Sequence, residues 1–333
     1  VANTIVIAVP VAVDISGVSA HLSLTEEVED LCQKIYRWGD DRLKRTAMLQ
    51  QIYFMAQHDR FYEARDLLLM SHLQDTIQHA DIPTQILFNR TMTQLGLAAF
   101  RQGRILDAHQ CLTDLVSGGK MKELLAQGIN IKSHQEKTPD QERQERRRQI
   151  PYHMHINLEL IETVHLISAM LLEVPNMALN AFDPKKKVIS KNFRRVFDWY
   201  DRQVFMGPPE NTREHVIAAS KLLLKGDWHA ATDLLLGLNI WKLLPNDKEI
   251  KELLRRKLQE EGLRTYLFTY SAYYDSISLK ELSSLFELPT NVVHSIVSKS
   301  IVSEELHASW DQPSSILVLH RAEPSRLQYL ALH

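Results

Sequence analysis

Apolar residues recur at spacings of three and four along most of the chain, and glycine or proline marks the breaks. This spacing predicts amphipathic helices, because it places the apolar side chains on one helical face. The pattern runs from Leu22 to about Gly128 and resumes after Pro151. The stretch from Ile156 to Leu172 is apolar on all sides, which predicts a buried helix at the centre of its layer.

Three segments of the helical pattern share one local signature. In each, a tight turn leads to a bulky apolar residue, an alanine follows three residues later, and a leucine follows four residues after that. The three copies span residues 58–68, 102–112 and 225–235. Their unequal distances predict helix-turn-helix hairpins of a degenerate, tetratricopeptide-like solenoid, with the alanine where a neighbouring helix approaches.

The pattern changes after Leu263. A short β-like segment, Ser276-Ile277, precedes a Ser-x-x-Glu sequence beginning at Ser278, which is typical of a capping box that opens a helix. A turn and N-cap at 288–290 predict a second short helix. Alternating residues up to Trp310, a turn over 311–314 and an apolar run over 315–320 predict a hairpin. Strand, two helices and hairpin together predict a winged helix.

We therefore expect a mainly α fold, with a tetratricopeptide-like helical repeat solenoid followed by a winged-helix subdomain that contains a small antiparallel β-sheet. The expected divisions are an apolar boundary segment over 1–20, helical repeats over 21–132, a charged connector over 133–150, a helical block over 151–262, a winged helix over 263–324, and a C-terminal helix or tail over 325–333. Pro10 and Asp14 interrupt the first segment and no basic residue precedes it, which argues against a signal peptide or a membrane span.

The composition is that of a soluble globular protein of more than one packing unit, with 333 residues of which 44% are hydrophobic. Basic and acidic residues nearly cancel, 39 against 41, so nucleic acid or an anionic membrane would need a local patch. Cys32 and Cys111 are far apart within helical patterns, which favours a reducing compartment over a disulfide framework. We expect a cytoplasmic protein.

The winged helix raises the question of DNA binding, because the second helix of this motif can enter the major groove. The predicted second helix, over 291–300, offers only His294 and Lys299 to phosphates or bases, and the wing turn carries Asp311. Neutralising several phosphates requires several cations on one face, so we expect no DNA binding.

Two basic clusters are candidates for contact with RNA phosphates without sequence readout. One consists of Lys185, Lys186, Lys187, Arg194 and Arg195, and the other of Arg143 and Arg146–Arg148. A solvated charged surface explains both clusters equally well.

The wing strand is the candidate subunit interface. Its residues Ile316, Leu317, Val318 and Leu319, together with Trp310, form an apolar segment that we interpret as exposed. An exposed strand of this kind adds to the sheet of a neighbouring protein or packs against it, and it needs no cations to do so.

The sequence carries no recognisable catalytic apparatus. His153 and His155 are a fragment of a metal site without a third ligand, so we expect a structural pair and no metal. Residues 117–120 resemble a phosphate loop, but Asp114 and Met121 stand where a glycine and a serine or threonine are needed, so we interpret them as a helix-ending turn. We expect no enzyme activity and no cofactor.

Helical repeats that lead into a winged helix resemble the PCI module, which is shared by the proteasome lid, the signalosome and translation initiation factor 3. Longer runs resemble one family in particular, the c subunits of eukaryotic translation initiation factor 3, from about Leu22 to His333. These runs are LMSHLQD at 69–75, IQHAD at 77–81, HINLEL at 155–160, SAMLLE at 168–173, GPPE at 207–210, LRTYLFTYS at 263–271, YDSIS at 274–278 and DQP at 311–313.

The resemblance implies a non-catalytic scaffold subunit that assembles with other PCI subunits, especially the a and e subunits, through winged helices packed side by side. It also implies association with the small ribosomal subunit in the cytoplasm during translation initiation. The alternative is a PCI scaffold subunit of the proteasome lid or the signalosome. The family's long N-terminal region, which contacts other initiation factors, lies outside this sequence, and residues 1–20 do not match the family.

Overall fold

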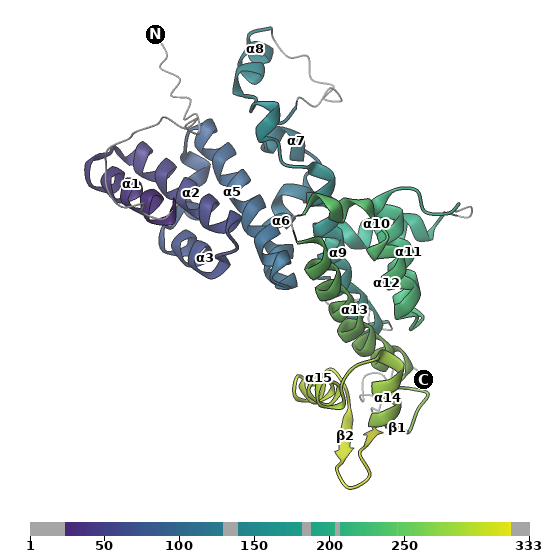
Figure 1. Cartoon of the computed structure of the whole chain (residues 1–333). Coiled ribbons are helices and arrows are strands. Elements are labelled where there is room, and N and C mark those ends of the chain that lie inside the picture. Colours follow the sequence, from purple (N-terminus) through teal and green to yellow (C-terminus); the bar gives the residue numbers. More distant parts are fainter. Residues whose placement is uncertain (1–23, 129–138, 182–187, 204–206, 245, 321–333) are drawn as a thin grey trace, which may run out of the picture.

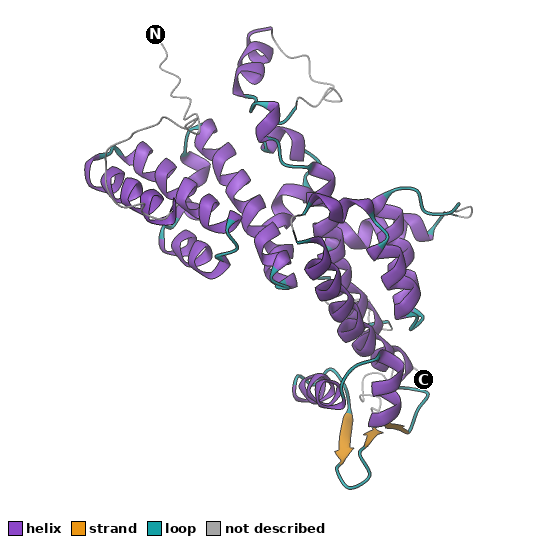
Figure 2. Ribbon diagram, viewed as in Figure 1, coloured by secondary structure: helices purple, strands orange, loops and turns teal. Residues whose placement is uncertain are grey.

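The computed structural model describes residues 24–128, 139–181, 188–203, 207–244 and 246–320. Over these ranges the chain is a stack of helices with a small three-stranded sheet at one end (Figures 1 and 2). The predicted mainly α fold is confirmed, whereas the expected segments over 1–20 and 325–333 lie outside the described residues. None of the described helices has an apolar stretch long enough to cross a membrane.

The first part of the stack follows the order of the chain. Helix α1 packs against α2, α2 against α5, and α5 against α6, while α3 packs against α2 and α5. Gly96 lets α5 and α6 approach closely, since a Cβ there would lie 2.8 Å from the Leu112 Cγ. The helices are α1 (Leu24–Trp38), α2 (Asp41–Gln57), α3 (Phe61–Met70), α4 (Leu73–Thr76), η1 (Ile77–His79), α5 (Ile82–Arg101), α6 (Ile105–Ser117) and α7 (Met121–Leu124).

Helix α9 is the central helix of the second part, as the all-round apolar pattern predicts. It packs against α5, α6, α10, α11 and α13, and most of its side chains are buried. The Asn157 side chain caps it by accepting the Glu159 and Leu160 amides at 2.9 and 3.2 Å. The elements are α8 (Pro139–Arg148), η2 (Tyr152–Met154), α9 (Leu158–Leu179), α10 (Lys191–Asp201), α11 (Thr212–Leu224), α12 (Trp228–Leu236), η3 (Asn239–Leu243) and α13 (Asp247–Tyr270).

The three copies of the sequence signature form the turns α2–α3, α5–α6 and α11–α12. The turn residues Asp59, Gly103 and Gly226 have φ values of 58°, 76° and 87°. In each turn the following amide donates to the carbonyl five residues earlier, at 3.0, 2.9 and 3.1 Å, which closes the preceding helix in a Schellman-type turn. The signature's apolar, alanine and leucine positions are all buried, so the prediction from local spacing is confirmed.

Alanine at Gly103 is expected to lower the free energy of unfolding by about 1–2 kcal/mol, because a side chain disfavours a left-handed backbone. The new Cβ would also lie 3.0 Å from the Leu253 Cδ1. Urea unfolding followed by circular dichroism measures the change. The control is Gly118→Ala, where φ is −81° and nothing lies within 4 Å of the added carbon. Equal effects of the two substitutions would contradict the role assigned to this turn.

The C-terminal unit has the predicted order of strand, two helices and hairpin. Its elements are β1 (Ser276–Ser278), α14 (Leu279–Phe286), α15 (Thr290–Val302), β2 (Ala308–Asp311) and β3 (Ile316–Leu319). The strands form an antiparallel sheet in the order β1-β3-β2. Helix α13 leads into this unit without a break, across the expected boundary between residues 262 and 263.

Two contacts fix the winged helix to the helical stack. The Trp228 Nε1 of α12 donates to the Leu285 carbonyl of α14 at 3.0 Å. The Arg264 guanidinium of α13 pairs with Glu305, in the α15–β2 connection, at 2.9 Å. The buried apolar cluster accordingly runs without interruption from Ile52 in α2 to Leu319 in β3.

The predicted capping box at Ser278 does not form. Ser278 is the N-cap residue of α14, but its side chain makes no capping hydrogen bond. Ser278 is also the last residue of β1, and the following amide, that of Leu279, donates to the Ser315 carbonyl beside the wing at 3.1 Å. Sheet pairing thus satisfies the first of the four free amides at the start of α14.

Candidate interaction surfaces

The wing strand β3 is not an exposed edge, and this corrects the interpretation made from the sequence. It lies between β1 and β2 and pairs with both. Both of its backbone edges are therefore used inside the sheet, so β3 has no free edge to add to a neighbouring sheet. The four apolar residues in a row are explained by this central position.

The two faces of the sheet differ in what they expose. Leu317 and Leu319 are buried against the helices, at 0% and 7% exposure, and so are not interface residues. Ile316 and Val318 are half-buried and point to the opposite face, because side chains alternate along a strand. On that outer face their neighbours in register are Ser276, Ser278, Ser309 and Asp311. The outer face is thus two aliphatic side chains framed by small polar ones.

Trp310 is a structural residue of the winged helix. Its indole Nε1 donates to the Ser298 Oγ at 3.1 Å, and its ring stacks on His294 with centroids 4.7 Å apart. Both partners belong to α15, so Trp310 fastens the edge strand β2 to that helix. His294, considered above as a possible phosphate contact, is therefore packed against an aromatic ring.

The edges of the sheet and the nearby helix ends carry the accessible apolar surface. Among the described residues, β1 and β2 pair on one side only. Val302, at the end of α15, is 84% exposed, and Tyr273, just before β1, is 80% exposed. Such surface near open strand edges is typical of a protein-binding region.

A hollow of about 440 Å³ lies between α13, β1 and α14. Tyr266 and Tyr274 line it together with Glu281 and the half-exposed Leu285. The two tyrosine hydroxyls are 3.1 Å apart, and burial, followed by the hydrogen bond to Tyr274, raises the pKa of Tyr266 to about 12. The hollow therefore presents two aromatic rings, and the Tyr266 phenol stays neutral at physiological pH.

The first basic cluster is only partly placed. Lys185, Lys186 and Lys187 lie outside the described residues, whereas Arg194 and Arg195 lie on α10. The Arg194 Nε is 3.7 Å from the buried carboxylate of Glu173 in α9. The Glu173 Oε2 also accepts the amides of Ile189 and Ser190 at 2.9 and 3.1 Å. Arg194 thus helps to neutralise a buried carboxylate, while Arg195 is exposed.

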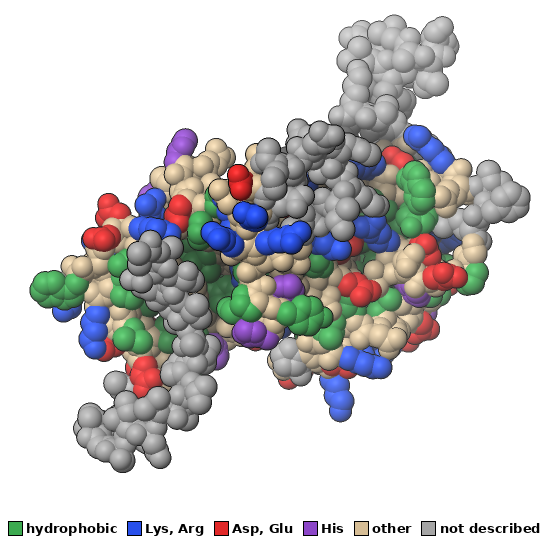
Figure 3. All heavy atoms as spheres, turned by 90° about the horizontal axis from the view of Figure 1, so that it is seen from above, with side chains coloured by type: hydrophobic (Ala, Val, Ile, Leu, Met, Phe, Trp, Pro, Cys, Tyr) green, Lys and Arg blue, Asp and Glu red, His purple; other side chains and the backbone are tan. Residues whose placement is uncertain are grey.

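The second basic cluster lies on α8, where the side chains of Arg143 and Arg146–Arg148 are exposed. Viewed from the side on which α8 projects, Lys and Arg side chains gather across the middle of the molecular face (Figure 3). The nearly equal numbers of basic and acidic residues in the whole chain give no sign of this local excess of basic side chains.

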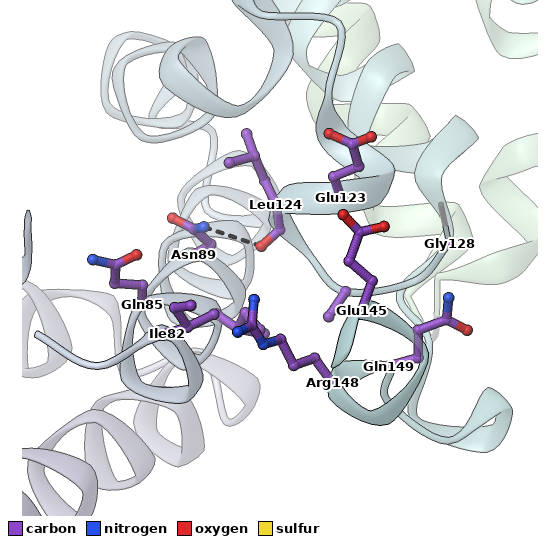
Figure 4. A pocket seen from close by; sticks show the side chains of 11 residues that line it. Ile82, Gln85, Asn89, Glu123, Leu124, Gly128, Glu145, Arg148 and Gln149 are labelled. Atoms are coloured by element: carbon purple, nitrogen blue, oxygen red, sulfur yellow. Dashed lines mark hydrogen bonds between the residues drawn. The ribbon is translucent and has the colours of Figure 1, made fainter. Parts of the chain in front are cut away.

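A cavity of about 220 Å³ separates α8 from the start of α5 (Figure 4). Arg148 extends from α8 toward Ile82 of α5, and the Asn89 Nδ2 donates to the Leu124 carbonyl at 3.0 Å. Glu123, Glu145 and several amides complete a mixed polar and apolar lining. Among the lining residues that the structure describes, no nucleophile stands beside a base.

The structure also describes the histidine pair and the phosphate-loop-like segment. His153 lies in the 3-10 helix η2, and the His155 Nε2 lies 2.9 Å from the Ile150 carbonyl. Over the described ranges, no group of three or more His, Cys, Asp or Glu is arranged to hold a metal ion. Residues 117–120 end α6 and turn through Gly119, at φ 65°, as the sequence predicts.

Comparison with known proteins gives matches to two family models. Residues 18–184 match the family model "Eukaryotic translation initiation factor 3 subunit 8 N-terminus", and residues 238–321 match the PCI domain model. The second match covers η3, α13 and the whole described winged helix.

Curated relatives match over nearly the whole chain. The C subunit of eukaryotic translation initiation factor 3 from Danio rerio is 54% identical over 310 residues, which is 92% of this chain and 34% of the relative. The protein of the same name from Culex quinquefasciatus is 50% identical over 319 residues, 94% of this chain and 35% of the relative. That of Aspergillus terreus is 49% identical over 320 residues, or 95% and 37%. The chain spans about a third of the length of these relatives.

Proposed function

Since this chain belongs to the C-subunit family of eukaryotic translation initiation factor 3, we propose that it is a non-catalytic scaffold segment of that factor, acting in the cytoplasm during translation initiation. The names of the relatives favour this assembly over the proteasome lid and the signalosome, the two alternatives. A stacked helical domain suits a scaffold, because it presents a long surface on a rigid frame.

The observation that carries the proposal is the winged helix at the end of the stack. Its sheet offers an outer face with Ile316 and Val318 and, within the described residues, two open edges at β1 and β2. The junction at Trp228 and Arg264 holds this unit firmly against the helices. A partner bound at the sheet would therefore be positioned relative to the whole stack.

We propose the a and e subunits of the factor as the partners at the winged helix, each contributing a winged helix of its own. The small ribosomal subunit is the proposed larger partner. Contact with RNA phosphates through Lys185–Lys187, Arg194 and Arg195 is a second proposal, which the exposure of Arg195 and the basic face of the molecule favour.

The test is a pull-down of the a and e subunits with this chain, comparing the wild type with the variant Ile316→Asp plus Val318→Asp. Two carboxylates on the outer face would have to be desolvated on binding, so we expect at least about a tenfold loss of both partners. Both side chains are already half-exposed, so circular dichroism should show an intact fold. Full retention of both partners would exclude this face as the interface.

A further inference from the structure

We propose that the outward face of α10 binds a short segment of single-stranded RNA, with one base stacked on Trp199 and the phosphates held by Lys191, Arg195 and Arg202. The inference deepens the proposed RNA contact and rests on it. It is independent of the winged helix, which lies at the far end of α13 from this helix (Figure 1).

Helix α10 separates its apolar and charged residues onto opposite faces. Phe193 and Phe197 are buried against the stack, at 0% and 8% exposure. The charged face borders a hollow of about 400 Å³, whose lining consists of Val188, Lys191, Arg194, Arg195, Asp198, Trp199 and Arg202. Four of these seven residues are cations and one is an acid, so the hollow is locally basic in a nearly neutral protein.

The cations follow a line along the helix. Lys191, Arg195 and Arg202 are separated by four and seven residues, which places them on one helical face. At 1.5 Å of rise per residue they span about 16 Å, a length that fits a few nucleotides of an extended strand. Arg194 lies beside this line but is shared with Glu173, so we assign it a smaller part.

Trp199 adds an aromatic ring, on which a base can stack, to the charged surface of α10. Its side chain is 57% exposed although it borders the hollow, and Tyr200 packs edge-on against it with centroids 4.7 Å apart at 87°. The neighbour restrains the indole, so a stacked base would find a platform that is already ordered. A large aromatic ring beside a row of cations is the arrangement by which proteins bind single strands without reading their sequence.

This chemistry favours a single strand over the other anions that a basic surface attracts. In a duplex the bases are stacked on one another and cannot reach Trp199, so duplex RNA would use the cations alone. An acidic peptide would likewise use the cations and would gain little from an indole. The contribution of Trp199 therefore distinguishes the three ligands.

The experiment is fluorescence anisotropy of a labelled 12-nucleotide oligouridylate titrated with the full chain. Trp199→Ala is expected to weaken binding at least about fivefold, because base stacking on an aromatic ring contributes substantially at each position. Lys191→Gln with Arg202→Gln is expected to reduce the salt dependence of log K by about 1.4, since each phosphate contact on a single strand contributes about 0.7. Asp198→Asn should strengthen binding, which a folding defect would not do.

The matched control removes two exposed charges outside both basic clusters, in the variant Arg37→Gln on α1 with Lys248→Gln on α13. We expect it to leave the affinity within about twofold. Suppose that Trp199→Ala binds the RNA as tightly as the wild type while Lys191→Gln with Arg202→Gln binds it weakly. The proposed phosphate contact on α10 is then supported, and the proposed base stacking on Trp199 is wrong. If the control and the α10 charge variant weaken binding equally, or if duplex RNA loses as much affinity as the single strand on Trp199→Ala, the whole assignment fails.

Discussion

Replacing Trp228 with alanine is expected to lower the free energy of unfolding by about 3–5 kcal/mol. The side chain is 2% exposed, and its Cβ faces Gly262 of α13, where an added Cβ would be only 3.3 Å away. The substitution opens a cavity between α12, α13 and α14 and leaves the Leu285 carbonyl without its donor. Urea unfolding followed by circular dichroism measures the loss.

Two variants separate packing from the hydrogen bond at this junction. Trp228→Phe keeps most of the ring volume but loses the indole N–H, so we expect a cost of about 1–3 kcal/mol from the unpaired carbonyl together with a small cavity. Trp199→Ala, at the exposed site on α10, should change stability by no more than about 0.5 kcal/mol. A Trp228→Ala variant as stable as Trp199→Ala would show that the winged helix is not fixed to the stack in this way.

Lowering the pH from 6.5 to 4 is expected to destabilise the chain through His165, by about 3 kcal/mol. His165 of α9 and His109 of α6 are buried, with stacked rings whose centroids are 5.1 Å apart. Burial, followed by the charge of His109, lowers the pKa of His165 to about 4, and burial also lowers the pKa of His109. Neither His165 ring nitrogen has a hydrogen-bond partner among the described residues.

The sign follows from which state binds the proton. Between pH 6.5 and 4 the unfolded chain protonates this histidine while the folded chain keeps it neutral, so stability is complete above pH 6.5 and falls as the pH drops toward 4. His165→Leu removes the titrating group and two unpaired nitrogens, so we expect at least wild-type stability at pH 7.5 and a smaller loss on acidification. Unfolding free energies at pH 7.5, 6 and 4.5 measure both effects. An unchanged pH dependence in His165→Leu would contradict the role given to this pair.

The sequence predicted those parts of the fold that depend on residues close together in the chain. The turn signature places its left-handed residue, its buried apolar residue and its close-approach alanine within eleven residues, so each copy could be recognised without knowing its neighbours. The same holds for α9, whose burial follows from apolar residues on every side.

The order of strands in the sheet could not be obtained in this way, because pairing joins residues 276–278 to residues 316–318 across some forty positions. The run from Ile316 to Leu319 was interpreted as an exposed wing, yet an unbroken apolar run is also typical of a central strand. Ser278 shows the same limit, since it stands at the N-cap of α14 as its local sequence predicts, whereas its pairing with Ile316 of β3 could not be predicted from neighbouring residues.

The sequence also identified only part of the candidate site on α10. Arg194 and Arg195 were identified from their charge, whereas Lys191, Trp199 and Arg202 were not. The spacing of residues in α10 already places Trp199 on the charged side of the helix, opposite Phe193 and Phe197. The sequence alone does not say which side of the helix packs against the stack, so the exposure of Trp199 could not be predicted.

We propose that the chain assembles through the outer face of its winged helix, and one quantitative comparison tests this proposal. The measurement is the fraction of the a and e subunits retained at equal protein concentrations by the wild type and by two matched variants. The first variant is Ile316→Asp with Val318→Asp, and the second is Leu31→Asp with Trp38→Asp, on the exposed apolar stripe of α1 at the other end of the stack. We predict that the first loses both partners and the second keeps both. Retention by the first variant with loss by the second would place the interface on the helical repeats and contradict the account.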